Sequence, residues 1–246
     1  MSTVRKHYVA RLVLRCMVLV LCFVLYVLGT EDFQILQGNN FFRQFSLFHL
    51  LWVVWLFDML AQLIPMKGTI SLGSQKHFLA KFRPITEKIH LAALKDYAVS
   101  TARAAYKVML LWIALIAAIG LLYYRGILHA EELFLISVLF YVCDLVCVLI
   151  WCPFRLLMKT RCCTTCRIFN WDHFMMFSPI VFINSFFTRS LFLLSLAVFA
   201  LWEVCAFLHP ERFWEQTNEA LRCAACTDKL CTQYCQKIRR KEQSAG

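Results

Sequence analysis

Glycine, proline and acidic residues are scarce in this sequence, and the shortages exclude several classes of protein. Only 7 glycines and 5 prolines occur in 246 residues, which leaves no glycine-rich phosphate-binding loop and no flexible linker. Neither Gly-x-Ser-x-Gly nor His-Glu-x-x-His is present, so the usual hydrolase and metalloprotease motifs are missing as well. We therefore expect a non-enzymatic protein.

Charged residues of both signs are also few. They make up 17% of the chain, whereas apolar residues make up 61% and the mean hydropathy is +0.63. A soluble domain has about 45–50% apolar residues. The composition predicts an all-α, polytopic membrane protein in the lipid bilayer, because helices satisfy their own backbone hydrogen bonds there.

The net charge of +11 has two explanations, and we favour the one that involves the membrane. Lys and Arg are typical of cytoplasmic loops that face an anionic leaflet. Nucleic acid is not an expected partner, because the sequence has no soluble basic domain with interleaved aromatic residues.

Hydropathy separates membrane segments from polar ones. Four clear transmembrane helices are expected, at 12–29, 45–64, 108–124 and 134–158. Within the last of these, Cys152-Pro153 predicts a kink or an early helix end. The chain then divides into a first transmembrane hairpin (1–65), a basic cytoplasmic loop with an amphipathic helix (66–107), a second transmembrane hairpin (108–158), a cysteine-rich cytoplasmic loop (159–172), a membrane segment (173–208) and a cysteine-rich cytoplasmic tail (209–246).

The basic loop 66–107 gives the strongest indication of orientation. It carries 8 Lys and Arg residues against 2 acidic residues, which places it in the cytoplasm of a protein of the cell membrane. The amino terminus, and by the count of crossings the carboxyl terminus, are expected on the same side. The amphipathic helix in this loop either lies on the membrane surface or docks a membrane or cytoplasmic protein partner.

The segment 173–208 can cross the membrane once or twice. Its 36 residues exceed the ~20 that one crossing needs and fall short of two crossings with a turn. We expect a helical hairpin, with a re-entrant helix at 173–187 and a full span at 190–208, since Arg189 then reaches water at the tip. A single long, broken helix is the alternative, and it would leave the tail outside.

Thirteen cysteines suggest a metal site. Two Cys-x-x-Cys pairs flank the last membrane segment, and four thiolates can hold zinc in a tetrahedral, structural site. An iron–sulfur cluster is the alternative cofactor, although the spacing in the tail differs from the compact ferredoxin motif. The preferred ligands are Cys163, Cys166, Cys223 and Cys226, with Cys162 and Cys231 as substitutes.

Three acidic residues fall inside predicted spans: Asp58, Asp144 and Glu203. Such residues are costly in the membrane, so we expect them to contact one another, water, or a partner such as Arg189 or His49. They form either a polar path for protons or cations, or hydrogen bonds that hold helices together. Cys143 and Cys147 share a helix face beside Asp144 and either bind a soft ion or simply face lipid.

The sequence favours a small transporter or channel, or an accessory subunit of a membrane complex. A membrane-bound redox protein, with an iron–sulfur cluster or exchangeable thiols, is the alternative. A membrane enzyme acting on lipid is indicated only by the acidic residues and His173.

Overall fold

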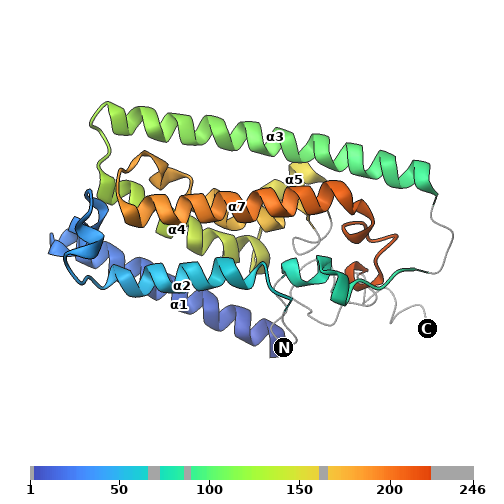
Figure 1. The fold of residues 1–246 in the computed structure, drawn as a ribbon, viewed down its shortest axis with the longest axis horizontal. Helices are drawn as coiled ribbons and strands as arrows, with labels where there is room; N and C mark the ends of the chain where they lie inside the picture. Colours follow the sequence, from blue (N-terminus) through green and yellow to red (C-terminus); the bar gives the residue numbers. More distant parts are fainter. Residues whose placement is uncertain (1–2, 66–72, 86–89, 161–165, 223–246) are drawn as a thin grey trace.

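The computed structural model describes residues 3–65, 73–85, 90–160 and 166–222, and the regular elements in these ranges are helices (Figure 1). Four helices are long and apolar enough to cross a membrane. The predicted all-α membrane fold is confirmed at this level. The four helices are α1 (Thr3–Val27), α3 (Leu91–Tyr124), α4 (Ala130–Leu149) and α7 (Phe186–Leu208).

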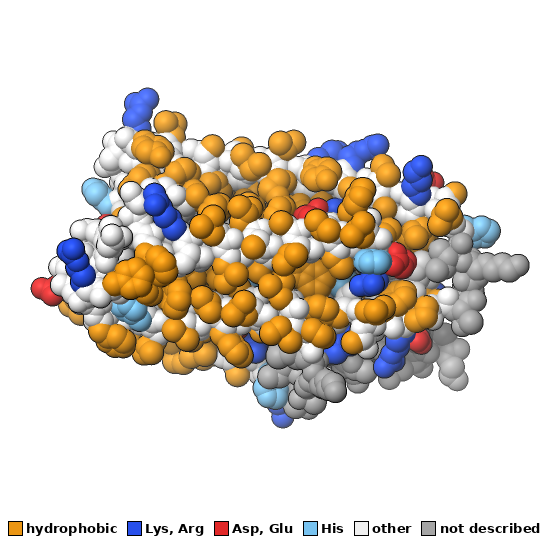
Figure 2. Space-filling view, in the orientation of Figure 1, with side chains coloured by type: hydrophobic (Ala, Val, Ile, Leu, Met, Phe, Trp, Pro, Cys, Tyr) orange, Lys and Arg blue, Asp and Glu red, His pale blue; other side chains and the backbone are white. Residues whose placement is uncertain are grey.

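Apolar side chains cover the outside of the helices as well as the core (Figure 2). Leu110 on α3 and Phe207 on α7 are 68% and 81% exposed, which would be costly in water and suits contact with lipid tails. The interior is built on aromatic rings, and Trp55 is fully buried against Phe134 and Phe177.

The second hydrophobic stretch forms a shorter helix than predicted. In place of a span over 45–64, α2 (Phe48–Ala61) has 14 residues and is about 21 Å long. The helix begins late because Asp32 holds the preceding residues: its Oδ1 accepts hydrogen bonds from Ser46 Oγ at 2.8 Å and from Leu47 N at 3.2 Å. This helix is therefore not one of the four long ones.

The helices lie roughly along one axis, and the two ends of the bundle differ (Figure 1). One end, here called the loop end, holds the turns at 28–47, 125–129 and 183–185. The opposite end, here called the tail end, holds residues 73–85, 166–171 and 209–222.

Helix α3 is continuous across the boundary predicted between the cytoplasmic loop and the third span. No glycine or proline interrupts the chain from Leu91 to Ile119, so nothing breaks the helix where its surface changes from amphipathic to apolar. Its 34 residues extend about 50 Å, whereas the hydrocarbon core is about 30 Å thick. The predicted amphipathic helix is thus the first part of the same rod.

The fourth hydrophobic stretch is divided at Pro153. Helix α4 ends at Leu149, and a separate short helix, α5 (Phe154–Met158), follows. Proline has no backbone N–H and fits only the first turn of a helix. The early helix end predicted from Cys152-Pro153 is confirmed.

The chain from 166 to 208 runs to the loop end and back. It contains η6 (Arg167–Trp171), α6 (Asp172–Phe177), η7 (Pro179–Phe182) and then α7. Ser185 caps α7 by accepting a hydrogen bond from Thr188 N at 3.2 Å, and it pairs with Gly38 at the loop end. At the tail end, Arg167 contacts Glu203 at 2.7 Å.

Residues 209–222 contain only the short 3-10 turns η8 (Pro210–Arg212) and η9 (Glu219–Leu221). The spacing of apolar residues predicts a helix here, and that prediction is wrong. The backbone instead bonds to the loop 73–85, through Glu219 N to the Arg83 carbonyl at 2.9 Å and Ile85 N to the Thr217 carbonyl at 3.3 Å. Tertiary hydrogen bonds have replaced local ones.

Candidate functional site

An ion pair joins α1 to α4 inside the bundle. The Nη1 of Arg15 lies 2.7 Å from Oδ2 of Asp144 and donates a second hydrogen bond, also of 2.7 Å, to the carbonyl of Tyr141. The guanidinium carbon lies 3.8 Å above the centre of the Tyr141 ring. The two charged side chains are only 11% and 21% exposed, so each charge depends on the other for compensation.

A second group of polar side chains lies where α2 meets α6. Gln62, just beyond the end of α2, donates hydrogen bonds of 2.9 and 2.7 Å to the two carboxylate oxygens of Asp172. The same carboxylate accepts from His173 N at 2.8 Å, and the His173 Nδ1 lies 3.2 Å away. The side-chain oxygen of Gln62 is buried and has no hydrogen-bond partner among the described residues.

Asp58 lies near both groups. It is half-buried, lies one helical turn before Gln62, and interacts electrostatically with both Arg15 and His173. We refer to the five ionisable residues as the charge cluster. Its members are Arg15, Asp58, Asp144, Asp172 and His173.

The charge cluster contains three carboxyl groups and one arginine, with His173 as the only other basic group. Asp144 lies five residues before the end of α4, which is about 8 Å along the helix. The site therefore lies within the apolar part of the bundle, near its tail end. Carboxylates in such surroundings are expensive unless cations or protons balance them.

Glu203 forms a separate ion pair on α7. Its carboxylate accepts hydrogen bonds from Arg167 Nη2 at 2.7 Å and from Trp171 Nε1 at 2.8 Å. The contact holds η6 against α7, and among the described residues it forms no hydrogen bond or ion pair with Asp144. Of the predicted polar path, Asp144 pairs with Arg15, Asp58 lies near the same arginine, and Glu203 is in its own pair.

The partners that the sequence suggested for these acids lie elsewhere. Arg189 is exposed in the first turn of α7, at the loop end, and Glu203 follows it by 14 residues, or about 21 Å along the helix. His49 bonds to the Phe41 carbonyl at 2.8 Å. Neither basic residue joins the charge cluster.

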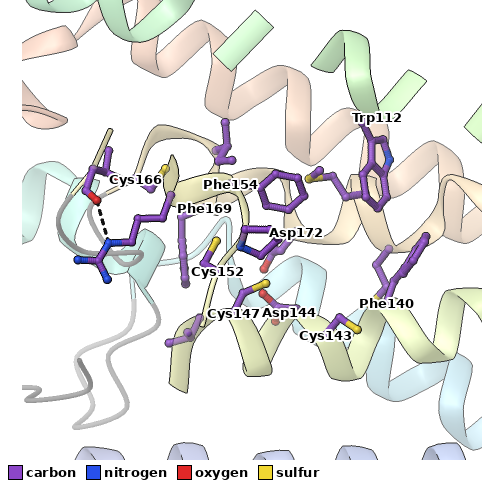
Figure 3. A pocket seen from close by; sticks show the side chains of 17 residues that line it. Trp112, Phe140, Cys143, Asp144, Cys147, Cys152, Phe154, Cys166, Phe169 and Asp172 are labelled. Atoms are coloured by element: carbon purple, nitrogen blue, oxygen red, sulfur yellow. Dashed lines mark hydrogen bonds between the residues drawn. The ribbon is translucent and has the colours of Figure 1, made fainter. Parts of the chain in front are cut away.

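A cavity of about 230 Å³ adjoins the charge cluster between α3, α4, α5 and α6. Figure 3 shows Asp144 and Asp172 facing each other on its wall, with Trp112 and Phe140 at one side. The remaining wall is mostly apolar and sulfur-containing. A small molecule or ion in this cavity would contact both carboxylates.

The proposed zinc ligands lie mostly outside the described residues, namely Cys162, Cys163, Cys223, Cys226 and Cys231. Cys166 is described; it is buried and borders the cavity. Among the residues that the structure describes, no three His, Cys, Asp or Glu side chains are grouped closely enough to hold a metal ion.

Sequence reasoning missed several members of the charge cluster. Arg15 bonds to Asp144, which is 129 residues away in the sequence. Gln62 and Asp172 meet only because the end of α2 lies beside α6. The available signal was the presence of ionisable residues next to long apolar runs. This signal does not indicate which of these residues form pairs.

No protein-family model matches this chain, and neither a curated protein nor a solved structure is significantly similar to it. The class of protein is therefore inferred from the fold and the candidate site alone. The chain is an all-helical protein with four helices suited to a membrane and a partly buried cluster of charges in its interior.

Proposed function

We propose that this chain is a multi-pass membrane transporter or channel-like protein that moves protons or small cations along the charge cluster. One observation carries the proposal: Asp58, Asp144 and Asp172 are gathered inside an apolar bundle where Arg15 is the only permanently charged cation of the cluster. The three carboxyl groups outnumber Arg15, and we propose that a mobile proton or small cation helps to balance them beside His173 and Arg155, which lines the adjoining cavity. A purely structural pair would need only Arg15 and Asp144.

The arrangement of the last membrane segment supports a crossing in both directions. Residues 167–185 and α7 lie antiparallel between the loop end and the tail end. We propose that 173–187 is a re-entrant segment in the membrane and that α7 is a full span. The tail end, which carries residues 73–85 and the start of α3, is then cytoplasmic, as the positive charge of the predicted basic loop favours.

A structural zinc site fits this topology. Cys166 and Arg222 are the described residues nearest in sequence to the two cysteine pairs, and both belong to the tail end, where η3 (Gly73–His77) contacts η6 and the loop 73–85 bonds to residues 217–219. We propose that Cys163, Cys166, Cys223 and Cys226 bind zinc there. The ion would fix the tail to the loop that follows α5.

Flux through the purified, reconstituted protein tests the transport proposal. Vesicles that contain a pH-sensitive dye report proton movement, and potassium or sodium gradients test the cations. We expect Asp58→Asn to abolish flux because it removes one of the carboxylates of the charge cluster. Asp58 forms no salt bridge within the described part of the chain, so its loss should not disturb the fold. The zinc content of the same preparation should be unchanged.

Two controls separate conduction from structure. Glu215→Gln alters an exposed acid at the tail end and should leave flux intact. The exchange Arg15→Asp with Asp144→Arg keeps an ion pair between α1 and α4 but moves the carboxylate, so the protein should fold and not conduct. Normal flux in Asp58→Asn and in the exchanged variant would show that the charges only hold helices together.

A further inference from the structure

The cavity beside the charge cluster is rich in sulfur. Four thiols and two thioethers line it, from α4, the break before α5, η6 and α6. Figure 3 shows several of these sulfur atoms around the same space. The six residues are Cys143, Cys147, Cys152, Cys166, Met175 and Met176.

Two of these thiols lie at the end of α4 and border the same cavity. Cys147 lies in the last turn of α4, and Cys152 lies between the end of this helix and Pro153. The two residues are neighbours on the cavity wall. Both side chains are half-buried, so the pair faces the cavity rather than open lipid on all sides.

The donor set favours a soft ion. Thiolates and thioethers select monovalent copper, whereas zinc and harder ions prefer several imidazole, carboxylate or thiolate ligands in one place. No such group of three occurs among the described residues. Monovalent copper is satisfied by two thiolates in a linear arrangement, so two thiols on the wall of one cavity are sufficient.

We propose that Cys147 and Cys152 form a binding site for monovalent copper in this cavity, with the thioethers of Met175 and Met176 as neighbouring soft donors. Binding replaces the two thiol protons, which leave to solvent, and forms a bis-thiolate complex with a single negative charge. Arg155, which lines the same cavity, offsets that charge. No electron is transferred, and the copper enters and stays in the monovalent state.

This inference goes beyond the proposed function, because the site can exist whether or not the protein transports anything. Its test is therefore a binding measurement. The full chain is prepared with Cys162, Cys163, Cys223, Cys226, Cys231 and Cys235 replaced by serine, so that thiols in the polar segments do not compete. Monovalent copper is then titrated anaerobically against a coloured chelator that is specific for this ion.

We expect this background to bind one copper per chain, and binding should strengthen as the pH rises because protons are released. Adding Cys147→Ser and Cys152→Ser should remove that copper. Adding Cys16→Ser and Cys205→Ser, at an exposed and a half-buried position outside the cavity, should not. A background without bound copper, or retention of copper after loss of Cys147 and Cys152, would overturn the proposal.

If the six-serine background does not fold, the otherwise unaltered chain supplies the test. The chain with Cys147→Ser and Cys152→Ser should bind one copper fewer than the unaltered chain, and equal amounts would overturn the proposal. Copper binding without any flux would reject the transport function and leave this site in place. Flux without copper binding would reject the copper site and leave the proposed transport function in place.

Discussion

His77 is a neutral side chain held between two segments at the tail end. Its ring stacks on Phe213 with the centroids 4.3 Å apart, and its Nδ1 lies 3.3 Å from the Arg212 carbonyl. Complete burial lowers the pKa of His77 to about 4; the hydrogen bond to Arg212 opposes this change, and the charge of Lys76 adds to it. The imidazole can therefore accept a proton only at considerable cost.

This burial predicts loss of stability in mild acid. An unfolded histidine titrates near pH 6.5, so the unfolded chain binds the proton first as the pH falls. The contribution of His77 is fully present above about pH 6.5 and is lost as the pH falls toward 4, by about 3 kcal/mol in total. Thermal unfolding in detergent between pH 7 and pH 4 measures this loss of stability.

The control for this prediction is a histidine that is exposed. His77→Phe keeps a flat ring against Phe213 and should remove most of the pH dependence, whereas His90→Phe should not, because His90 is exposed. Equal pH dependence in the unaltered chain and in His77→Phe would contradict the assignment.

At the scale of elements, the packing of η7 against α3 depends on a single glycine. A side-chain carbon on Gly120 would overlap the ring of Phe182. We expect Gly120→Ala to lower the free energy of unfolding by about 1–3 kcal/mol, as overpacking usually does. The unfolding temperature in detergent reports the change.

A second substitution shows whether this contact is the cause. Phe182→Leu removes the ring tip and should restore much of the stability lost in Gly120→Ala. Ala118→Val, on an exposed position of the same helix, should have little effect. If Gly120→Ala is as stable as the unaltered chain, η7 does not depend on the close approach to α3.

The elements were predictable where one local feature determines them. Long apolar runs predict α1, α4 and α7, and Pro153 predicts the end of α4. The start of α2 was not predictable, because hydropathy continues from Phe45 while the bonds that delay the helix come from Asp32, 14 residues earlier than Ser46. Tertiary contacts also explain why residues 209–222 are not a continuous helix.

At the scale of the molecule, the proposed topology predicts which end of the bundle faces the outside of the cell. Arg189 at the loop end and Glu215 at the tail end are both exposed. We expect Arg189→Cys to react with a membrane-impermeant maleimide in intact cells. Glu215→Cys should react only after the cells are permeabilised.

The unaltered chain, which keeps its native thiols, sets the background for this labelling. Reaction of Glu215→Cys in intact cells would place the tail end outside. The basic segment 66–107, the re-entrant segment and a cytoplasmic zinc site would then all be misplaced.

The candidate site was predictable only in part. Asp58 and Asp144 stand out as acids in apolar stretches, because a carboxylate in the membrane is costly unless it is paired or functional. Their pairing depends on which helices are neighbours, and α1 and α4 are separated by more than a hundred residues. A single sequence does not show which helices are neighbours. The role of Arg15 and the cavity could therefore be identified only from the structure.

The length of α3 has a mechanical consequence. The rod is longer than the hydrocarbon core, and it continues without a break to Tyr97, whose hydroxyl donates to the Phe213 carbonyl at 2.9 Å and whose ring stacks on Trp214. Helices adapt to thin or thick bilayers by tilting. We therefore expect a change in bilayer thickness to shift residues 213–214 together with the tilt of α3.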